Sequence, residues 1–299
     1  MTPHEFLQYI PATNCGECGY AACLAFAVAV TKGGVAPDLC PYLQKEKLPA
    51  EFASARGETG LKQVERGQDE RDMALVAFMK SKIQSADFAQ LSRRLGTDWS
   101  ADRPDQLRFR YLGRLIFLGK DAVVMDGEDL VDPRDQILLY NYVAFGGKAN
   151  GPANGEINDG GNGAEARIPN GVWVGMESLP NSIAKIRTLA TYCEARLAER
   201  FAGRIEQLAL LCERIGGEIG NDEQAQSADF SSTLPVLPHV PLALLFWDQD
   251  VEEGFEARVK ILFDEHVMDF LDLESLVFAA ERMADRLLEL DESDEELRS

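Results

Sequence analysis

The stretch Thr13–Cys23 reads TNCGECGYAAC, and a fourth cysteine follows in the pair Cys40-Pro41. Four of the chain's six cysteines therefore lie within the first forty residues, separated by gaps of two, four and sixteen residues. A two-residue gap lets a tight turn aim two sulfur atoms at one point. A glycine directly follows each of the first two cysteines, and glycine permits positive φ and a close backbone approach. The pattern predicts a small fold in which four thiols converge.

Four converging thiolates are the ligands that an iron–sulfur cube requires. Backbone N–H groups in the glycine-containing turn can point at such a cluster and stabilise its negative charge. The third cysteine opens an apolar helical stretch, in which Phe26 and Val30 can keep water away from one side. We therefore predict one 4Fe–4S cluster, with a ligand set made of Cys15, Cys18, Cys23 and Cys40.

Two other interpretations of the cysteines compete with a cluster. A structural zinc site usually shows two short Cys or His pairs separated by a longer gap. Here three cysteines are crowded and one is remote, and His4 precedes the turn. Buried thiols without a metal are the other alternative, although four cysteines in twenty-six residues are dense for that role. Both stay open beside the cluster.

Residues Ile10–Tyr42 resemble the 4Fe–4S module of the corrinoid iron–sulfur protein of the acetyl-CoA pathway, and the similar module in the B subunit of the Rnf electron-transport complex. The shared features are TNCGECG, a third cysteine before an Ala-Phe-Ala helix, and a terminal Cys-Pro. The resemblance implies the same four cysteine ligands. It covers about a tenth of the chain, and Tyr20-Ala21-Ala22 departs from it without removing a ligand.

Charge and composition exclude several partners. The chain of 299 residues carries 50 acidic and 30 basic side chains, a formal charge of −20. Such a surface repels nucleic acid and anionic lipid. It suits docking to a basic patch on a protein partner, and a solvated acidic surface is the plainer interpretation. Met1–Tyr9 lacks the basic and apolar regions of a signal peptide, and no apolar run is long enough to span a bilayer. We therefore expect a cytoplasmic protein without a membrane span.

The hydrophobic pattern predicts an α+β protein: a small helical 4Fe–4S module followed by a mixed domain with an antiparallel sheet. We expect the module to occupy residues 1–45, followed by a charged, glycine-dotted linker at 46–67. The α+β domain of unknown function then covers 68–290. An acidic tail, 291–299, is expected to be frayed.

Within the domain, helical periodicity is expected around 73–83, 88–95 and 134–145. Short strands separated by Gly- or Asp-containing turns at 107–112, 115–118 and 122–125 predict a meander. Further strands are expected at 171–176, 240–247 and 257–263, with prolines 235, 238 and 241 forming an extended entry into the second of these. A glycine-rich stretch, 146–163, is predicted to be a surface loop.

The longest apolar stripe predicts one continuous helix from about Ser182 to Arg214, and a final amphipathic helix is expected at 273–290. Cys193 and Cys212 lie nineteen residues apart on the first of these, roughly 28 Å in a straight helix. They cannot pair with each other, so we interpret both as buried core thiols.

Few other residues suggest chemistry. Acidic residues surround His239 and His266 in sequence, including Asp248, Asp250, Glu252, Asp264 and Glu265. A metal or acid–base site is conceivable there, and a solvated strand edge is the plainer interpretation. The sequence contains no Ser–His–Asp set, paired-carboxylate motif or phosphate loop, so we expect electron transfer rather than catalysis.

The segments Pro238–Asp248 and Ile261–Asp264 resemble a bacterial domain family of unknown function that follows cluster modules of this kind. That resemblance implies an anaerobic setting and no established activity. We expect a low-potential electron carrier or redox accessory protein whose partner is a redox protein, with a corrinoid-linked protein as one candidate. Two alternatives remain: a cluster-dependent enzyme whose large domain binds a small molecule in a pocket lined by Trp173, Trp247 and His239, and an interaction module in which the cluster is structural or sensory.

Overall fold

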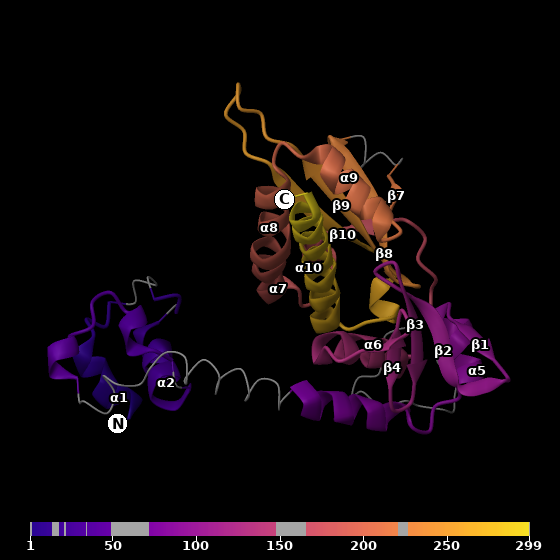
Figure 1. The fold of residues 1–299 in the computed structure, drawn as a ribbon, viewed down its shortest axis with the longest axis horizontal. Coiled ribbons are helices and arrows are strands. Elements are labelled where there is room, and N and C mark those ends of the chain that lie inside the picture. Colours follow the sequence, from indigo (N-terminus) through magenta and orange to yellow (C-terminus); the bar gives the residue numbers. More distant parts are fainter. Residues whose placement is uncertain are drawn as a thin grey trace. The chain divides into compact units, whose positions relative to one another are not determined.

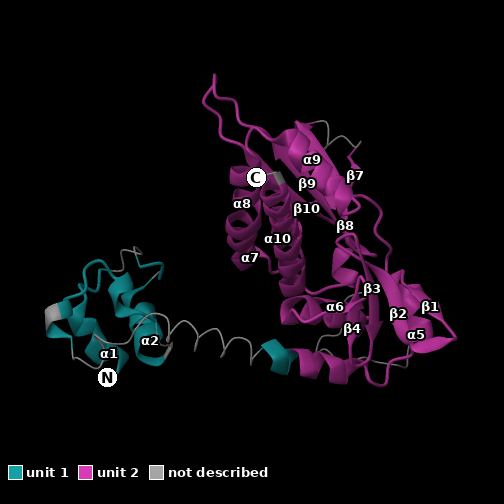
Figure 2. Cartoon of the chain, in the orientation of Figure 1, with its two compact units in different colours: residues 1–75 teal, residues 76–299 magenta. Residues whose placement is uncertain are grey.

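The chain divides into two compact units, residues 1–75 and 76–299 (Figure 2). The predicted linker, 46–67, lies outside the described residues from residue 49 onward, and so does the glycine-rich stretch beyond Gly147. The computed structural model describes residues 2–13, 18–20, 22–33, 35–48, 72–147, 166–220 and 227–298.

Up to residue 48, the described part of the first unit is helical (Figure 1). Its elements are α1 (Pro3–Phe6), η1 (Leu7–Tyr9), α2 (Cys23–Gly33), η2 (Pro37–Leu39) and η3 (Lys45–Lys47). This agrees with the predicted small helical module.

A capping box starts α1. The Thr2 hydroxyl accepts a hydrogen bond from the Glu5 N–H, and the Glu5 carboxylate accepts one from the Thr2 N–H at 2.7 Å. Two N–H groups that the helix itself leaves without partners are thereby satisfied. The cap fixes the start of a helix that brings Phe6, fully buried, into the core of the unit.

The first sheet is an antiparallel meander in which the strands follow one another in chain order. This confirms the meander predicted from the short, turn-separated apolar runs. Its strands are β1 (Asp98–Ser100), β2 (Arg103–Tyr111), β3 (Arg114–Gly119), β4 (Val123–Met125) and β5 (Glu128–Asp129).

Two of its hairpins use the same tight turn. Leu112 and Gly113 have φ of 48° and 79°, and Asp126 and Gly127 have 52° and 94°. Positive φ at both central residues is the type I′ geometry, which matches the twist of the flanking strands. The two glycines differ in their surroundings: a Cβ at Gly113 would lie 2.8 Å from the backbone of Ile215, whereas one at Gly127 would meet nothing within 4 Å.

This difference makes the two glycines a matched pair. Gly113→Ala is expected to lower the free energy of unfolding by about 2–4 kcal/mol, because backbone strain is joined by overlap with the end of a neighbouring helix. Gly127→Ala is expected to cost only about 1–2 kcal/mol, from strain alone. Urea unfolding of both variants measures the difference. Equal losses of unfolding free energy in the two variants would show that the backbone at Ile215 shifts at little cost to make room for the added Cβ.

The helices predicted before and after these strands in the sequence are present. One spans residues 72–83, and the others are α5 (Phe88–Leu95) and α6 (Pro133–Phe145). The Asp87 carboxylate caps α5 by accepting hydrogen bonds from the N–H groups of Ala89 and Gln90. Gly96 ends that helix in the left-handed conformation.

The second sheet is also antiparallel, with strand order β6-β10-β9-β8-β7. Two antiparallel sheets among helices confirm the predicted α+β class. Its strands are β6 (Trp173–Val174), β7 (Glu218–Ile219), β8 (Phe230–Leu237), β9 (Val240–Trp247) and β10 (Arg258–Asp264).

Strand β8 differs from the sequence prediction, which treated its prolines only as an extended entry into β9. It pairs with β9 from Phe230 to Leu237, with Pro235 opposite Pro241. The register shifts between Pro235 and Leu237, and such a bulge accommodates a residue without an N–H group. Pro235, expected in an extended entry into β9, therefore lies in a paired strand of its own.

The single helix predicted from Ser182 to Arg214 is wrong. The chain forms α7 (Ile183–Leu189), a π-helical turn η5 (Ala190–Glu194), α8 (Ala195–Phe201) and then α9 (Ile205–Arg214). The break lies at Gly203, whose φ is +70° and whose N–H donates to the Asp248 carboxylate at 2.7 Å. An apolar stripe continues across the break because both helices cover the same core.

The final helix is longer than predicted. Helix α10 (Leu273–Arg298) continues through the segment that we expected to fray. Asp291 in this segment is fully buried and accepts hydrogen bonds from Arg200 at 2.6 Å and Arg204 at 2.8 Å. Farther on, Asp294 pairs with Arg214 at 2.8 Å. Acidic side chains that suggested a solvated tail instead anchor the helix to α8 and α9.

One hydrophobic core joins both sheets of the second unit to its helices. The sheets meet where the Leu112 N–H donates to the Val236 carbonyl at 3.3 Å, and α10 packs against α6, α7, α8 and α9. Cys193 and Cys212 are 0% and 1% exposed in this core, and neither forms a disulfide, as predicted. Burial raises the pKa of the Cys212 thiol to about 12.

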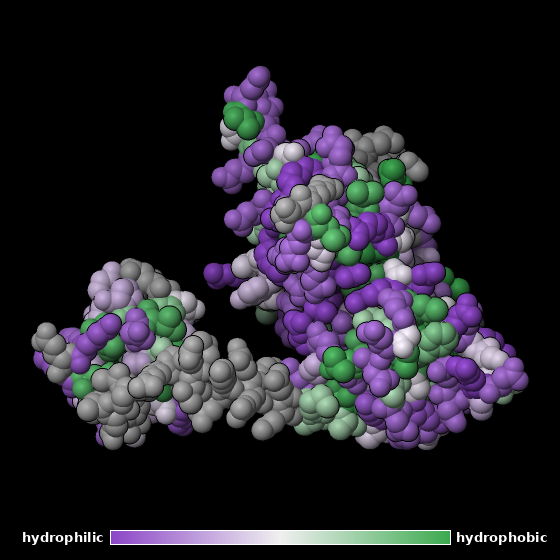
Figure 3. All heavy atoms as spheres, viewed as in Figure 1, coloured by the Kyte–Doolittle hydropathy of each residue, from purple (hydrophilic) through white to green (hydrophobic). Residues whose placement is uncertain are grey.

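Hydrophilic residues cover most of the visible face of the second unit (Figure 3). Exposed apolar residues such as Val131, Ile183 and Phe255 come from separate elements. Among the described helices, none combines the length and the apolarity that crossing a bilayer requires.

Candidate iron–sulfur site and a basic cavity

Three of the four predicted ligands belong to one hydrophobic cluster in the first unit. Cys23 and Cys40 are 9% and 6% exposed within it, and Cys18 is partly buried against it. Cys15 lies outside the described residues. The three described cysteines come from separate segments of chain, and the fold brings these segments to a common apolar surface.

Local structure explains these positions. Gly19 has φ of +83°, which turns the chain sharply between Cys18 and the helix. Cys23 is the first residue of α2. Cys40 is the C-cap of η2, where its N–H donates to the Pro37 carbonyl at 3.3 Å.

A backbone hydrogen bond closes the module behind Cys40. The Gln44 N–H donates to the Tyr9 carbonyl at 2.9 Å, which ties the chain after Cys40 to the end of η1. The fourth cysteine, remote in sequence, is thereby held near the first helices. The sixteen-residue gap before Cys40 is the length needed for α2 and the return through η2.

Aromatic side chains form the apolar wall. Phe26 is fully buried, with its ring centroid 6.0 Å from that of Phe6 in an edge-to-face contact and 5.5 Å from that of Tyr20. Val30, one turn further along α2, is 6% exposed. The burial predicted for Phe26 and Val30 is confirmed.

The donor chemistry fits an iron–sulfur cluster. The side chains gathered here are thiols, which are soft donors suited to iron and zinc, and a largely apolar surround limits solvent access. Within the described ranges, no three His, Cys, Asp or Glu side chains are arranged so that they alone could hold a metal ion. The ligand set therefore stays a prediction.

The second unit does not contain the predicted pocket of two tryptophans and a histidine. Trp173 and Trp247 pack with Ala243, Leu245 and Leu262 in a small apolar cluster on one face of the sheet. His239 precedes β9 and Trp247 ends it, so the two lie roughly 26 Å apart. They cannot line one pocket.

His239 is instead a packing residue. Its ring centroid lies 4.9 Å from that of Phe270, and a Cβ at Gly96 would lie 2.6 Å from its Nε2. Burial lowers the pKa of His239 below its usual value. A glycine at the end of α5 leaves the space that the imidazole fills.

This burial predicts a pH dependence. Because the unfolded chain binds the His239 proton more readily, stability is full above a pH of about 6.5 and falls as pH decreases toward the lower folded pKa. His239→Gln should remove this component. Urea unfolding at pH 8 and pH 5.5, compared between the two proteins, isolates it from the titration of other groups. If His239→Gln lost as much unfolding free energy between pH 8 and pH 5.5 as the unaltered protein does, the role given to His239 would be contradicted.

The acidic residues near the late histidines mainly cap backbone groups. Asp264 is fully buried, which corrects the expectation that it faces solvent. Its carboxylate accepts from the N–H groups of Asn170 and Gly171 at 2.8 Å and of His266 at 2.9 Å. Asp250, Glu252 and Glu265 are exposed, as the solvated-edge interpretation predicts.

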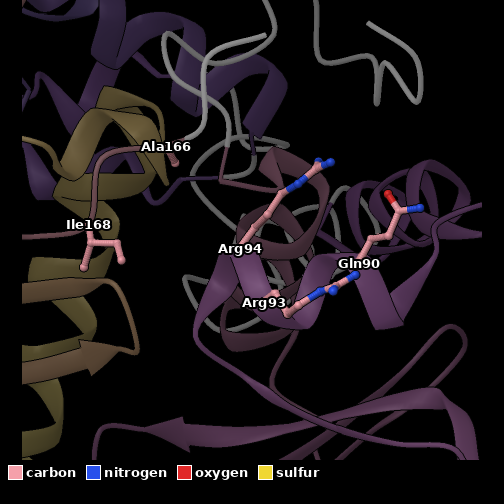
Figure 4. A pocket seen from close by; sticks show the side chains of 5 residues that line it. All are labelled: Gln90, Arg93, Arg94, Ala166 and Ile168. Carbon is pink, nitrogen blue, oxygen red and sulfur yellow. The ribbon is translucent and has the colours of Figure 1, made fainter. Parts of the chain in front are cut away.

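A cavity of about 430 Å³ opens elsewhere in this unit. Gln90, Arg93 and Arg94 of α5 line one side, and Ala166 and Ile168 line the other (Figure 4). Among the described residues that line it, the charged groups are two guanidinium groups, on a chain whose net charge is −20. No pattern in the sequence indicates this cavity.

Comparison with known proteins agrees with this picture of the first unit. Residues 10–42 match the family model described as "Putative Fe-S cluster". This match confirms the resemblance of Ile10–Tyr42 to an iron–sulfur module that the sequence predicted. The chain is 50% identical over 46 residues to acetyl-CoA decarbonylase/synthase complex subunit gamma 2 of Methanosarcina thermophila, which is 15% of this chain and 10% of the relative. It is 40% identical over 55 residues to the corrinoid/iron–sulfur protein large subunit of Moorella thermoacetica, covering 18% and 12%.

A further match is 37% identity over 49 residues to an uncharacterized protein of Methanocaldococcus jannaschii, covering 16% of this chain and 22% of the relative. The chain spans about a tenth of the length of the two named relatives. Residues 162–286 match the model of DUF3786, a domain of unknown function, which confirms the second predicted resemblance. No solved structure gives a significant match.

Proposed function

We propose that residues 1–45 bind one 4Fe–4S cluster through Cys15, Cys18, Cys23 and Cys40, and that the protein transfers low-potential electrons. The observation that supports this most is that three of these cysteines, from separate segments, share one apolar cluster in the matched module. Such a cluster takes up and releases one electron at a time, at a potential set by its surroundings.

The chain's own residues perform the supporting tasks. The cysteine thiols lose their protons when they bind iron. Phe26, Val30 and Phe6 exclude water from the buried side, and lower polarity there shifts the potential of the cluster. Cys18 is the most exposed of the three described thiols. Electrons are therefore proposed to enter and leave the cluster on the side of Cys18.

The partner is proposed to be a redox protein with a basic docking surface. A net charge of −20 favours encounter with such a surface at low ionic strength. The matched relatives are named as a subunit of an acetyl-CoA decarbonylase/synthase complex and as a corrinoid/iron–sulfur protein, so a corrinoid-linked partner is a specific candidate. The second unit is proposed to carry the docking surface.

Anaerobic purification tests the cluster. We expect about four irons and four sulfides per chain, and an EPR signal after reduction with dithionite. Cys15→Ser, Cys18→Ser, Cys23→Ser and Cys40→Ser should each lose that signal or convert it to a three-iron type. Cys212→Ser is the control, since this thiol lies in the core of the second unit and should leave iron content unchanged.

The outcomes separate the alternatives. Zinc in place of iron, with no EPR signal, would make the module a structural knuckle. Intact iron content in any of the four serine variants would remove that cysteine from the ligand set. A cluster that cannot be reduced and reoxidised would leave a structural or sensory role and contradict electron transfer.

A further inference from the structure

The cavity beside α5 has two chemically different walls. Gln90, Arg93 and Arg94 supply a carboxamide and two guanidinium groups from one helix, and Ala166 and Ile168 supply an apolar wall from a distant segment (Figure 4). Its volume, about 430 Å³, lies within the range of small-molecule sites. Ile168 is 67% exposed, so its apolar surface is available to a ligand.

The two arginines differ from most others in this unit. Within the described ranges, the side chains of Arg93 and Arg94 form no ion pair and no hydrogen bond. Arg167, which sits between the two apolar wall residues in sequence, is fully engaged: its Nε and Nη2 donate to Asp269 at 3.0 and 3.1 Å. Both arginines are exposed at the edge of the cavity, and no carboxylate in the described part of the chain competes with a ligand for their guanidinium groups.

The apolar wall is held rigidly. Asp269, 1% exposed, accepts from both the backbone and the side chain of Arg167. Asp264, fully buried, accepts from the N–H groups of Asn170 and Gly171. Two buried carboxylates thus fix the segment that carries Ile168, and a preformed wall lowers the entropic cost of binding.

We propose that this cavity binds a small organic anion, with its carboxylate or phosphate between Arg93 and Arg94 and its apolar part against Ile168. Guanidinium groups match both anions through paired hydrogen bonds, and Gln90 can donate a further hydrogen bond from its amide. The site lies in the second unit and uses none of the cluster ligands, so it does not depend on the redox proposal.

Isothermal titration of the full-length protein with defined probes tests this. Phenyl phosphate and benzoate represent the two anion classes, and benzyl alcohol is the uncharged counterpart. At least one of the two anions is expected to bind saturably, and benzyl alcohol is not. Arg93→Gln and Arg94→Gln should each weaken the binding about tenfold or more.

Two control variants make the test specific. Arg187→Gln removes an exposed arginine of α7 that also pairs with no carboxylate in the described part of the chain, and it should leave the affinity unchanged. Ile168→Ser should weaken the binding of phenyl phosphate while leaving that of inorganic phosphate unaltered. Circular dichroism confirms that each variant is folded.

The proposal is overturned if neither anion binds at millimolar concentration, or if Arg187→Gln weakens binding as much as the cavity variants. Equal binding of benzyl alcohol would also overturn it, because the arginines would then contribute nothing. If phenyl phosphate binds and benzoate does not, the ligand class narrows to phosphate esters. The reverse result narrows it to carboxylates.

Discussion

Replacing Asp135 with alanine is expected to lower the free energy of unfolding by about 3–5 kcal/mol. Asp135 is 2% exposed and accepts hydrogen bonds from Arg282 Nε at 2.7 Å and Nη2 at 3.1 Å. It also accepts from the Tyr111 hydroxyl at 2.7 Å. Removal of the carboxylate would leave a buried guanidinium without its bidentate partner and a buried hydroxyl without an acceptor.

The charges of the neighbours support this expectation. Burial by itself lowers the pKa of Arg282, but the hydrogen bond to Asp135 and the charges of its neighbours, Asp135 first among them, together outweigh burial and leave the pKa raised. Burial, together with the charge of Asp135, holds the pKa of Tyr111 well above its usual range. Asp135 and Arg282 join α6 to α10 across 147 positions of sequence. Loss of this pair is therefore expected to destabilise the whole second unit.

Urea unfolding measures the effect against a matched control. Asp105→Ala removes an aspartate that is 75% exposed and lies 3.2 Å from Lys120, and it should cost less than about 1 kcal/mol. Replacing Asp135, Arg282 and Tyr111 together with apolar residues should cost less than Asp135→Ala alone, since the guanidinium and the hydroxyl that bond to Asp135 are then removed with it. Equal costs for Asp105→Ala and Asp135→Ala would contradict the assigned role.

Removing iron is expected to unfold the first unit and leave the second folded, and this prediction rests on the proposed cluster. Only eight buried residues form the core found in the described part of the first unit. A module of about 45 residues rarely folds on such a core without a metal or disulfides. Cluster binding then supplies folding free energy directly.

Chelation of the oxidised protein, and Cys40→Ala, should both open the first 48 residues to limited proteolysis. Thermal unfolding of the 76–299 unit should stay unchanged. Leu39→Ala is the neighbouring control, because Leu39 is 52% exposed and supplies no ligand. If the first unit resists proteolysis without iron, its hydrophobic core is sufficient to fold it and the prediction is wrong.

Local chemistry made much of this fold predictable. The first-sheet turns were visible because Gly113 and Gly127 occupy positions that require positive φ. Helix α6 was visible because Asp132-Pro133 begins it, with the Asp132 carboxylate accepting from the Arg134 N–H. Such signals act within a few residues, so no tertiary partner is needed to interpret them.

Errors arose where distant partners override local preference. Pro235 suggested only an extended entry into β9, yet residues 230–237 pair with β9 through a bulge and form the strand β8. Acidic residues marked 291–299 as frayed, yet Arg200 and Arg204 bind Asp291. In both cases the stabilising groups come from other elements, so no pattern within the segment reveals them.

The candidate sites divide in the same way. By itself, the sequence determined the spacing of Cys15, Cys18, Cys23 and Cys40, because a cluster module is compact and its ligands are close along the chain. Only the tertiary structure decided that Arg93 and Arg94 lack carboxylate partners among the described residues while Arg167 has Asp269, and that Ile168 lines the same cavity. The physical reason is that an ion pair or a cavity forms only where segments distant in sequence come together in the fold. The order of charged residues along the chain does not show which segments these are.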